Sequence, residues 1–433
     1  MSRPPTARTV LFCRAPARNG PGPLTGLAGR SLIHHVLNAA GAAATRLTVV
    51  GADDEVTAHV RELPGAGDAT FRQGGAGHAL RAALAQDAED GSVTVVVRSD
   101  TPLLARESVA HLTRSLSEGR YAAVRSGPAW AFDTAQLAGA LRSADPAADG
   151  AEVEEVMTEV VKFLEAAGAP VASLATGPEE SLAVTDQLSL AEAGRLMRDR
   201  VLRRWMSEGV TVADPATTWI DVDVVLTSGV TILRNTELSA GTTIGAGCTI
   251  GPDTTLVGTR VGARSRVRSS TCEFVRIGPE NNVGPYSYLR GGTASGRGVI
   301  MGSHVHIKAS TIGDESSVPH FAYLGDITIG ARSNISGFSG TVNFDGVKTH
   351  ETTVGDDVMI GAGTILVAPI DIGGGAFTAA GSLLTRDVPP GSLALTRIRQ
   401  EHIDGWVEST MPESRAALTA RALRDDTDPS RDG

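Results

Sequence analysis

A six-residue spacing of aliphatic residues constrains this 433-residue chain more than any other feature. One run places Ile232, Leu238, Ile244, Ile250 and Leu256 at six-residue steps, and after a slip of one residue the spacing resumes. It does so at Val261 and Val267 and again at Ile277 and Val283, and a second unbroken run comprises Val354, Ile360, Leu366, Ile372, Thr378 and Leu384. Neither an α-helix nor a flat strand has this period. A left-handed parallel β-helix does, because each short strand sends one aliphatic side chain inward before a tight turn.

We therefore predict a left-handed β-helix of hexapeptide repeats over residues 213–407, with on the order of ten coils. Many of the 50 glycines directly follow an inward position, as in Ile244-Gly245 and Ile277-Gly278. A glycine-rich sandwich with chance spacing is the alternative, and the number of in-phase positions argues against it.

The first part of the chain, residues 1–185, has a different pattern. Short apolar runs alternate with helical patterns, which predicts a parallel sheet covered by helices, an α/β domain. The expected strands are 10–12, 47–50 and 93–97, and the expected helices are 31–43, 54–62 and 77–85.

Two further segments complete the predicted organisation. Residues 186–212 are polar and strongly helical, with Leu188, Leu190, Leu196 and Met197 on one side, so we expect a connecting helix. Residues 408–433 are rich in Asp, Arg, Ser and Pro, and we expect a disordered tail.

Composition excludes several classes of protein. The 39 basic and 49 acidic residues give a net charge of −10, and the basic residues are scattered, so we expect no nucleic-acid partner. No apolar run reaches the roughly 20 residues that span a bilayer, and the first residues show no signal-peptide pattern. Cys13, Cys248 and Cys272 form neither a disulfide framework nor a metal cluster. We expect a cytoplasmic protein without a membrane partner.

The predicted β-helix itself favours one class of activity. Coils of this kind commonly pack side by side as homotrimers, and the grooves between them suit a long acyl carrier such as coenzyme A. On the fold alone an acyltransferase is favoured, although one fold supports many functions.

Several motifs between Asp214 and Trp406 together resemble a known family. They are DPATTWIDVDV at 214–224, PYSYLR at 285–290, HIKAS at 306–310, HFAYLGD at 320–326, Asn334-Ile335, NFDG at 343–346, LVAPIDIG at 366–373, AAGSLLTRDVPPGSLAL at 379–395 and Gly405-Trp406. They resemble the acetyltransferase half of the bifunctional N-acetylglucosamine-1-phosphate uridyltransferase / glucosamine-1-phosphate N-acetyltransferase family. The N-terminal half is similar to its nucleotidyltransferase-like (Rossmann-like) domain in outline only, through LAGRSLIHHV, GAGHAL and SDTPLL.

The resemblance assigns the catalytic base. An amine must lose a proton when it attacks a thioester, and a neutral imidazole can accept that proton. His320 aligns with the family's base, although an isolated histidine is more often structural. His304, His306 and His350 lack that context, and we interpret them as surface or groove residues.

The resemblance also implies two binding sites. Arg290, Lys308, Tyr323 and Asn334 align with residues that bind the amino sugar phosphate, and guanidinium and ammonium groups suit a phosphate. Acetyl-coenzyme A would contact Gly337, Asn343, Phe344, Ala362, Ala380 and Arg397. Asn343 would orient the amine or polarise the thioester carbonyl.

Three positions depart from the family pattern. Phe344 stands where the family has Tyr, Ala362 where it has Ser, and Thr349 where it has a phosphate-binding Lys, with Lys348 next to it. These departures put the identity of the acceptor sugar in doubt.

The N-terminal domain lacks most of the chemistry that nucleotidyl transfer needs. The glycine-rich phosphate loop of the family is replaced by FCRAPARNGPGPLTGLAG at 12–29, and no Lys precedes Lys162. Asp100 aligns with one Mg²⁺ ligand, but Thr185 stands where the family has Asn. The strands that carry the sugar ligands are missing between Val124 and Phe132. We predict that uridyltransferase activity is lost, and Mg²⁺ would be needed only if it remains.

Three functions stay open at this point. The first is an acetyl-coenzyme A-dependent N-acetyltransferase acting on glucosamine 1-phosphate or a related amino sugar, for nucleotide-sugar or peptidoglycan precursor synthesis. The second is a bifunctional enzyme that also makes UDP-N-acetylglucosamine from UTP. The third is a non-catalytic scaffold or regulator, which the changes at Phe344, Thr349 and Ala362 would favour.

Overall fold

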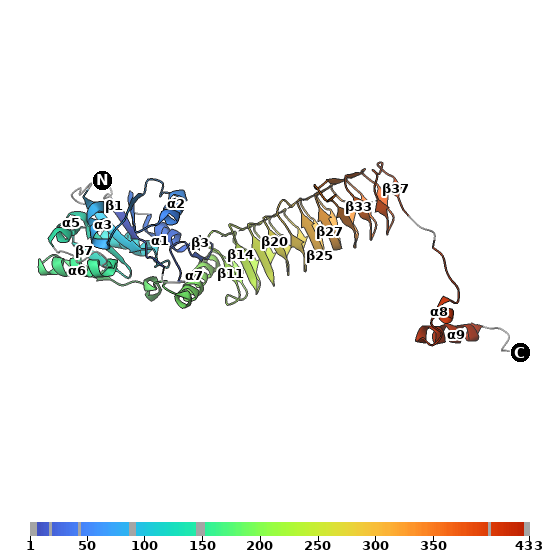
Figure 1. Cartoon of the computed structure of the whole chain (residues 1–433), viewed down its shortest axis with the longest axis horizontal. Coiled ribbons are helices and arrows are strands. Elements are labelled where there is room, and N and C mark those ends of the chain that lie inside the picture. Colours follow the sequence, from blue (N-terminus) through green and yellow to red (C-terminus); the bar gives the residue numbers. More distant parts are fainter. Residues whose placement is uncertain are drawn as a thin grey trace.

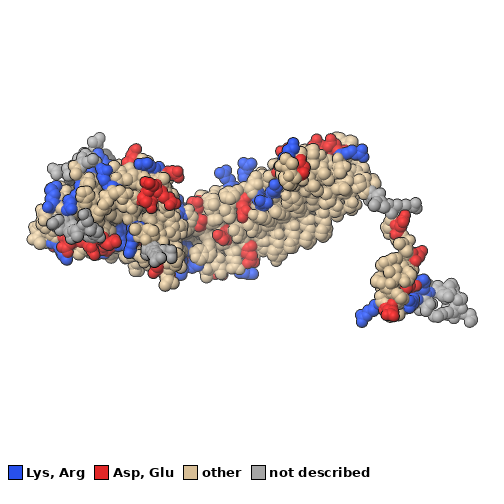
Figure 2. Space-filling model, in the orientation of Figure 1, with Lys and Arg blue, Asp and Glu red and all other residues tan. Residues whose placement is uncertain are grey.

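The computed structural model describes residues 7–16, 20–41, 45–85, 92–143, 152–396 and 400–427. Figure 1 shows an α/β domain at one end, a long β-helix extending from it, and two short helices beyond the far end of the β-helix. In the view of Figure 2, charges of both signs are scattered over the α/β domain, and long stretches of the β-helix surface carry no charge.

The α/β domain is built on a seven-stranded sheet with the order β5-β4-β1-β6-β8-β7-β9. Its strands are β1 (Ala7–Phe12), β4 (Arg46–Val50), β5 (Thr70–Arg72), β6 (Val93–Arg98), β7 (Ala123–Ser126), β8 (Ala129–Asp133) and β9 (Val171–Leu174). β8 runs antiparallel to β6 and β7. The prediction of a parallel sheet is therefore wrong for this strand. The turn between β7 and β8 at Gly127-Pro128 is too short for the crossover that parallel strands need.

Helices cover both faces of this sheet, as the alternating pattern predicts. α1 (Leu32–Ala40), α2 (Asp54–Glu62) and α4 (Arg106–Ser117) bury their apolar residues on one face. On the other face lie α3 (Ala76–Leu84), α5 (Thr134–Ser143) and α6 (Val153–Ala166). Short elements complete the domain: β2 (Gly26–Leu27), β3 (Arg30–Ser31) and the 3₁₀ helix η2 (Pro178–Ser181).

The connecting helix α7 (Gln187–Ser207) packs on both parts of the molecule. Its first half buries Ala193 and Met197 against the α/β domain, and its last turns bury Leu202 and Trp205 at the start of the β-helix core. The side that the sequence predicted is largely the one that packs: Met197 is buried, and Leu190 and Leu196 pack partly buried against the same core. Leu188, at the start of the helix, is the exception and is 82% exposed.

The β-helix has three faces, each a ladder of short parallel strands stacked coil upon coil. Face A comprises β10 (Thr211–Val212), β13 (Thr231–Ile232), β16 (Thr249–Ile250), β19 (Arg266–Val267), β22 (Asn282–Val283), β29 (Asn334–Ile335), β32 (Met359–Ile360), β35 (Phe377–Thr378) and β37 (Leu393–Ala394). Face B comprises β11 (Trp219–Ile220), β14 (Thr236–Ser239), β17 (Thr254–Val257), β20 (Thr271–Glu273), β23 (Tyr288–Leu289), β30 (Gly340–Val342), β33 (Ile365–Val367) and β36 (Leu383–Leu384). Face C comprises β12 (Val225–Leu226), β15 (Thr243–Ile244), β18 (Arg260–Val261), β21 (Arg276–Ile277), β24 (Ala294–Ser295), β26 (Thr311–Ile312), β28 (Ile327–Ile329), β31 (Thr352–Val354) and β34 (Ile370–Ile372).

Two long strands, β25 (Ile300–Lys308) and β27 (Ser317–Gly325), bend from face A into face B. Each therefore carries residues of both faces and of the corner between them. The segments that sequence motifs single out, HIKAS and HFAYLGD, lie on these two strands and their ends.

The β-helix interior confirms the six-residue prediction. Every predicted inward position is buried, and all but Thr378 belong to one continuous core. The hydroxyl of Thr378 accepts a bond from the Gly361 N–H at 2.9 Å and bonds Thr364 Oγ1 at 2.9 Å, which satisfies this polar group inside the coil. The slip in spacing shortens a turn and leaves the ladder intact, since Ile244 pairs with Val261.

Glycine after an inward residue allows successive coils to approach closely. A Cβ on Gly278 would collide with the backbone of Gly296 in the next coil. Any larger residue there would push the two coils apart.

The C-terminal segment corrects another expectation. Residues 406–427 contain α8 (Trp406–Thr410) and α9 (Arg415–Thr427), so disorder is the wrong prediction for this part. Arg424 pairs with Glu408, which ties the two helices together. Within the part of the chain that the structure describes, no helix is both long and apolar enough to cross a bilayer.

Candidate active site

Two predicted cations lie side by side at the end of face B. Leu289 pairs with Ile307 in adjacent coils, so Arg290 and Lys308, the next residue in each coil, are ladder neighbours. The Arg290 guanidinium lies 5.9 Å from the centre of the Tyr288 ring. The inward Leu and Ile fix both backbones, and the outward cations stay accessible.

Lys308 lies in a group of polar side chains that also includes Tyr323, Asp326 and Asn343. Its Nζ lies 3.4 Å from Asp326 Oδ2, and Asn343 Nδ2 donates to the same oxygen at 2.5 Å. A Cβ on Gly325 would lie 2.8 Å from Asn343 Nδ2 and 2.9 Å from the Tyr323 hydroxyl oxygen. Gly325 therefore allows these two polar groups to approach the same point. We call Arg290, Lys308, Tyr323, Asp326 and Asn343 the polar cluster.

Sequence reasoning missed two residues of this region, Asp326 and His306. His306 lies between the rings of Tyr288 and Tyr323, with ring centres 5.1 and 5.4 Å away. Its Nε2 is buried and has no hydrogen-bond partner. Burial and the charge of Arg290 lower the pKa of His306, so the ring is neutral near pH 7. The sequence did contain one indication of this role for His306. It precedes Lys308 by two residues, and side chains two residues apart on a strand point to the same side of the sheet.

His320 lies on β27, at the opposite edge of face B. It pairs with Ser303, is exposed, and precedes the corner residue Phe321, whose φ is 41°. Gly337 lies directly above it in the next coil, because a Cβ on Gly337 would be 3.5 Å from His320 Cβ.

Two further predicted coenzyme residues continue along this corner. The N–H of Gly363 bonds the Gly337 carbonyl at 2.9 Å, and the N–H of Gly381 bonds the Ala362 carbonyl at 2.8 Å. Ala362 and Ala380 therefore occupy successive coils beyond Gly337. We call His320, Gly337, Ala362 and Ala380 the corner row; beyond His320 its small side chains leave the backbone open to a ligand.

The remaining predicted residues lie around these two groups. Asn334 is on face A, where it pairs with Ser317 and its Nδ2 donates to Ser336 Oγ at 3.1 Å. Phe344 is 59% exposed and forms an isolated antiparallel bridge with Thr349. Arg397 lies outside the described residues.

A loop between faces B and C, residues 343–351, carries Phe344, Lys348 and Thr349. Asp345 organises it by accepting bonds from the N–H groups of Val347 and Lys348 at 2.8 Å and by pairing with His350 Nε2 at 2.7 Å. These bonds, above all the one from His350, lower the pKa of Asp345 to about 2. These bonds hold the loop in one conformation, and Lys348 is exposed on it.

The structure does not bring all predicted residues together within one chain. The polar cluster and the corner row occupy opposite edges of face B, and the ladder positions of His320 and Lys308 are five residues apart. At about 3.3 Å per strand residue, this separation is up to roughly 16 Å. Within one chain the polar cluster and the corner row are therefore two separate groups on face B.

The α/β domain places Asp100 at the carboxyl end of β6, where open α/β sheets bind ligands. Asp100 is buried and both of its oxygens are occupied. Arg98 Nε and Nη2 donate to it at 2.9 and 3.0 Å, and Arg14 Nη1 donates at 3.2 Å.

The residues around Asp100 do not fit the Mg²⁺ that the resemblance implies. Thr185 offers a neutral hydroxyl, and the adjacent Asp186 is used as the N-cap of α7, where it binds Ser189. Across the described ranges, no cluster of three His, Cys, Asp or Glu side chains suits a metal ion.

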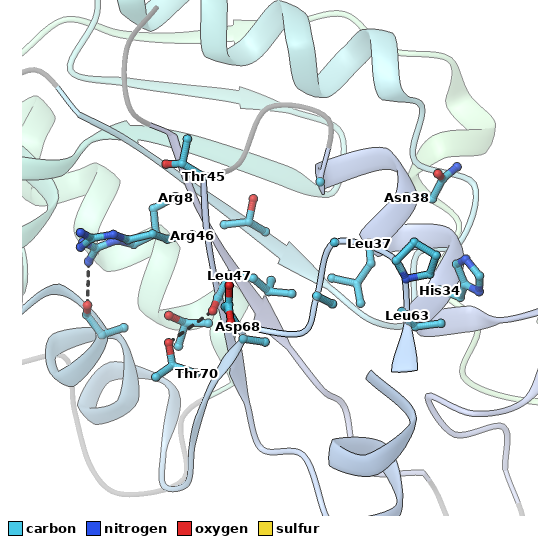
Figure 3. A pocket seen from close by; sticks show the side chains of 18 of the residues that line it. Arg8, His34, Leu37, Asn38, Thr45, Arg46, Leu47, Leu63, Asp68 and Thr70 are labelled. Carbon is cyan, nitrogen blue, oxygen red and sulfur yellow. Dashed lines mark hydrogen bonds between the residues drawn. The ribbon is translucent and has the colours of Figure 1, made fainter. Parts of the chain in front are cut away.

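Cavities mark both ends of this sheet. One of about 290 Å³ is lined by Arg14, Asp100 and Thr185, at the expected ligand end. Another, of about 560 Å³, lies at the opposite end beside Arg8, Asn38 and Asp68 (Figure 3). The second cavity contains none of the predicted site residues.

Comparisons with known proteins agree with this architecture. A profile of the MobA-like NTP transferase domain matches residues 19–210, which confirms the nucleotidyltransferase-like fold of the first domain. "Bifunctional protein GlmU" of Streptomyces coelicolor is 39% identical over 93% of this chain and 93% of its own length. The chain belongs to the GlmU family. The GlmU proteins of Streptomyces avermitilis and Corynebacterium jeikeium are 39% and 36% identical, each over 92% of this chain and over 93% and 92% of their own lengths.

Proposed function

We propose that this GlmU family member is an acetyl-coenzyme A-dependent N-acetyltransferase that acts on glucosamine 1-phosphate or a closely related amino sugar. The observation that supports this most is the pairing of Arg290 and Lys308 beside Asn343 and Tyr323. Two adjacent cations suit a sugar phosphate, and the neighbouring amide and hydroxyl suit sugar oxygens and a carbonyl.

His320 is the base in this proposal. The amine nitrogen of the sugar attacks the thioester carbon, a C–N bond forms and the C–S bond breaks. His320 takes the proton that the amine loses and returns it to the departing thiolate, so the imidazole is regenerated. Asn343, whose Nδ2 lies 2.5 Å from Asp326 Oδ2, is held in place to orient the reacting groups.

A homotrimer completes this site. The outward residues of faces A and B become apolar or aromatic toward the last coils, as at Met359, Phe377 and Leu383. Face C instead presents threonines at the corresponding positions of β26, β28 and β31. Faces A and B therefore suit burial against other copies. Such packing would bring the corner row of one chain to the polar cluster of another, with coenzyme A along the corner row.

The α/β domain does not transfer uridyl groups in this proposal. Asp100 is neutralised by two arginines, and a direct turn from β7 to β8 leaves no room for further sugar-binding strands. Pyrophosphate release from UTP and N-acetylglucosamine 1-phosphate with Mg²⁺ tests this point. Sustained release would favour the bifunctional alternative.

The acetyltransferase is tested with a panel of amino sugars and their 1-phosphates, by following free thiol released from acetyl-coenzyme A. Wild-type protein is expected to acetylate at least one phosphorylated amino sugar, and His320→Ala is expected to lose this activity. The matched control is His111→Ala, an exposed histidine on α4. Full acetyl transfer by His320→Ala would refute the assignment.

A further inference from the structure

The carboxyl end of β6 carries a continuous chain of alternating charges. Arg14 and Arg98 bind Asp100, Arg98 also binds Glu154, and Arg125 Nη2 reaches Glu154 Oε1 at 3.2 Å. The chain joins the end of β1, the end of β6, the first turn of α6 and strand β7. Asp100 and Arg98 are its most buried members, with side chains 5% and 17% exposed.

Arg98 makes the contacts that a metal ion would otherwise make with Asp100. Its guanidinium contacts both carboxylate oxygens, and Oδ2 also receives Arg14. A divalent cation would need an oxygen lone pair at about 2.1 Å, where these N–H groups already point. It would also lie beside two positive charges, which oppose its entry.

We propose that the Arg98 guanidinium is the resident cation of this domain and replaces the divalent metal at Asp100. It neutralises the buried carboxylate and cross-links β6 to α6 through Glu154. The domain therefore folds without a divalent metal.

The replacement of a metal ion by the Arg98 guanidinium follows from the loss of stability that an unpaired buried charge causes. A buried carboxylate without a partner is strongly destabilising, whereas a paired and hydrogen-bonded one is tolerated. An arginine two residues earlier on the same strand is a permanent partner, because its guanidinium stays protonated at every physiological pH. Removal of Arg98 should leave an anionic pocket that is open to a metal ion.

The test uses the full-length chain, with Mn²⁺ as the probe and the paramagnetic resonance signal of free Mn²⁺ as the readout. Wild-type protein is expected to leave the free signal undiminished. The double variant Arg14→Ser/Arg98→Ser is expected to bind Mn²⁺ and to gain unfolding temperature when Mn²⁺ is added. A further Asp100→Asn substitution should abolish both effects.

Arg125→Ser is the matched control, because it removes an arginine of the same charge chain that does not touch Asp100; it should bind no Mn²⁺. Saturable Mn²⁺ binding by wild-type protein that Asp100→Asn removes would overturn the proposal. So would a double variant that binds no Mn²⁺. If the double variant does not fold alone, refolding with Mn²⁺ or with a chelator decides: recovery only with Mn²⁺ supports the proposal, and equal failure contradicts it.

This inference is independent of the acetyl-transfer proposal. The same variants leave the β-helix unchanged, so their thiol release from acetyl-coenzyme A should match wild type. An inactive β-helix would leave the Mn²⁺ result unaffected, and Mn²⁺ binding by wild-type protein would leave acetyl transfer unaffected.

Discussion

Lys308 and His320 lie on neighbouring strands at ladder positions five residues apart: on β25 and β27, Lys308 pairs with Gly325 and His320 pairs with Ser303. The cation therefore lies at one edge of face B, and the imidazole lies beside the corner residue Phe321 at the other edge. In the proposed homotrimer, the Lys308 and the His320 of one site come from different copies of the chain.

Mixed assemblies test this relationship directly. Lys308→Ala and His320→Ala should each be nearly inactive when purified alone. Co-expressed and purified together with two different tags, they should regain a fraction of wild-type thiol release, because some sites then combine an intact Lys308 with an intact His320.

Each variant co-expressed with a second tagged copy of itself is the control and should remain inactive. A mixed preparation that also stays inactive, while its size and composition show both variants in one assembly, would mean that both residues serve a site within one chain.

Arg290→Ala is expected to weaken recognition of the phosphate. Charged hydrogen bonds contribute about 1.5–3 kcal/mol, so kcat/KM for a phosphorylated amino sugar should fall roughly 10- to 100-fold, mainly through KM. The exposure of Arg290 favours the lower end of this range. Initial rates at varied sugar concentration measure it.

Arg276→Ala, an exposed arginine on β21 of face C, is the matched control for charge removal. Equal losses in Arg276→Ala and Arg290→Ala would point to a general electrostatic effect, and would contradict a specific phosphate contact.

Thr349→Lys should improve the use of phosphorylated acceptors. Thr349 lies on the loop shaped by Asp345 and faces Phe344 across an isolated bridge. An added ammonium group there would lower KM for an amino sugar phosphate by roughly tenfold. KM for the unphosphorylated sugar should not change. Steady-state rates with the matched pair of sugars measure the difference.

Thr349→Gln keeps the longer side chain without the charge, and it should behave as wild type with both sugars. An equal gain for phosphorylated and unphosphorylated acceptors, or no gain for either, would exclude Thr349 from the phosphate site.

Much of the β-helix could be predicted because its six-residue period records a repeated physical constraint. Every coil must bury one aliphatic side chain per strand, so the inward positions are readable without tertiary information. The polar exception, Thr378, could not be explained that way, since its partners Gly361 and Thr364 come from a neighbouring coil. The antiparallel direction of β8 and the exposure of Leu188 on α7 depended on tertiary packing and were predicted incorrectly.

The site was only partly accessible from sequence. Motifs identified the individual residues of the polar cluster and the corner row, but their separation depends on which edge of face B each one occupies. His306 was passed over because its position between Tyr288 and Tyr323 arises from stacking of three coils. The hydrogen bond from Arg14 to Asp100 could not be predicted either, because the two residues lie 86 positions apart in the sequence and only the folded α/β domain brings them together.

The junction between the α/β domain and the β-helix should give a pH-dependent stability. Asp221 lies against Gly29, and its neighbour Val222 donates its N–H to the Ala28 carbonyl at 3.1 Å. Burial, and then the nearby carboxylate of Asp223, raise the pKa of Asp221 from 3.8 to about 6. The folded state therefore binds this proton more tightly than the unfolded chain does.

The sign of the effect follows from linkage. Below pH 3.8 the carboxyl group is protonated in both the folded and the unfolded state, so it does not lower the free energy of unfolding. As the pH rises to about 6 the folded state loses stability, and above that the full penalty remains. Asp221→Asn removes the charge, so it should raise the unfolding temperature at pH 7 and have no effect near pH 3. Thermal unfolding of the full chain across this range measures the difference. Asp371→Asn, an exposed carboxylate on β34, is the control and should show no such pH dependence. A gain for Asp221→Asn that is the same at every pH would show that the charge of Asp221 is not its cause.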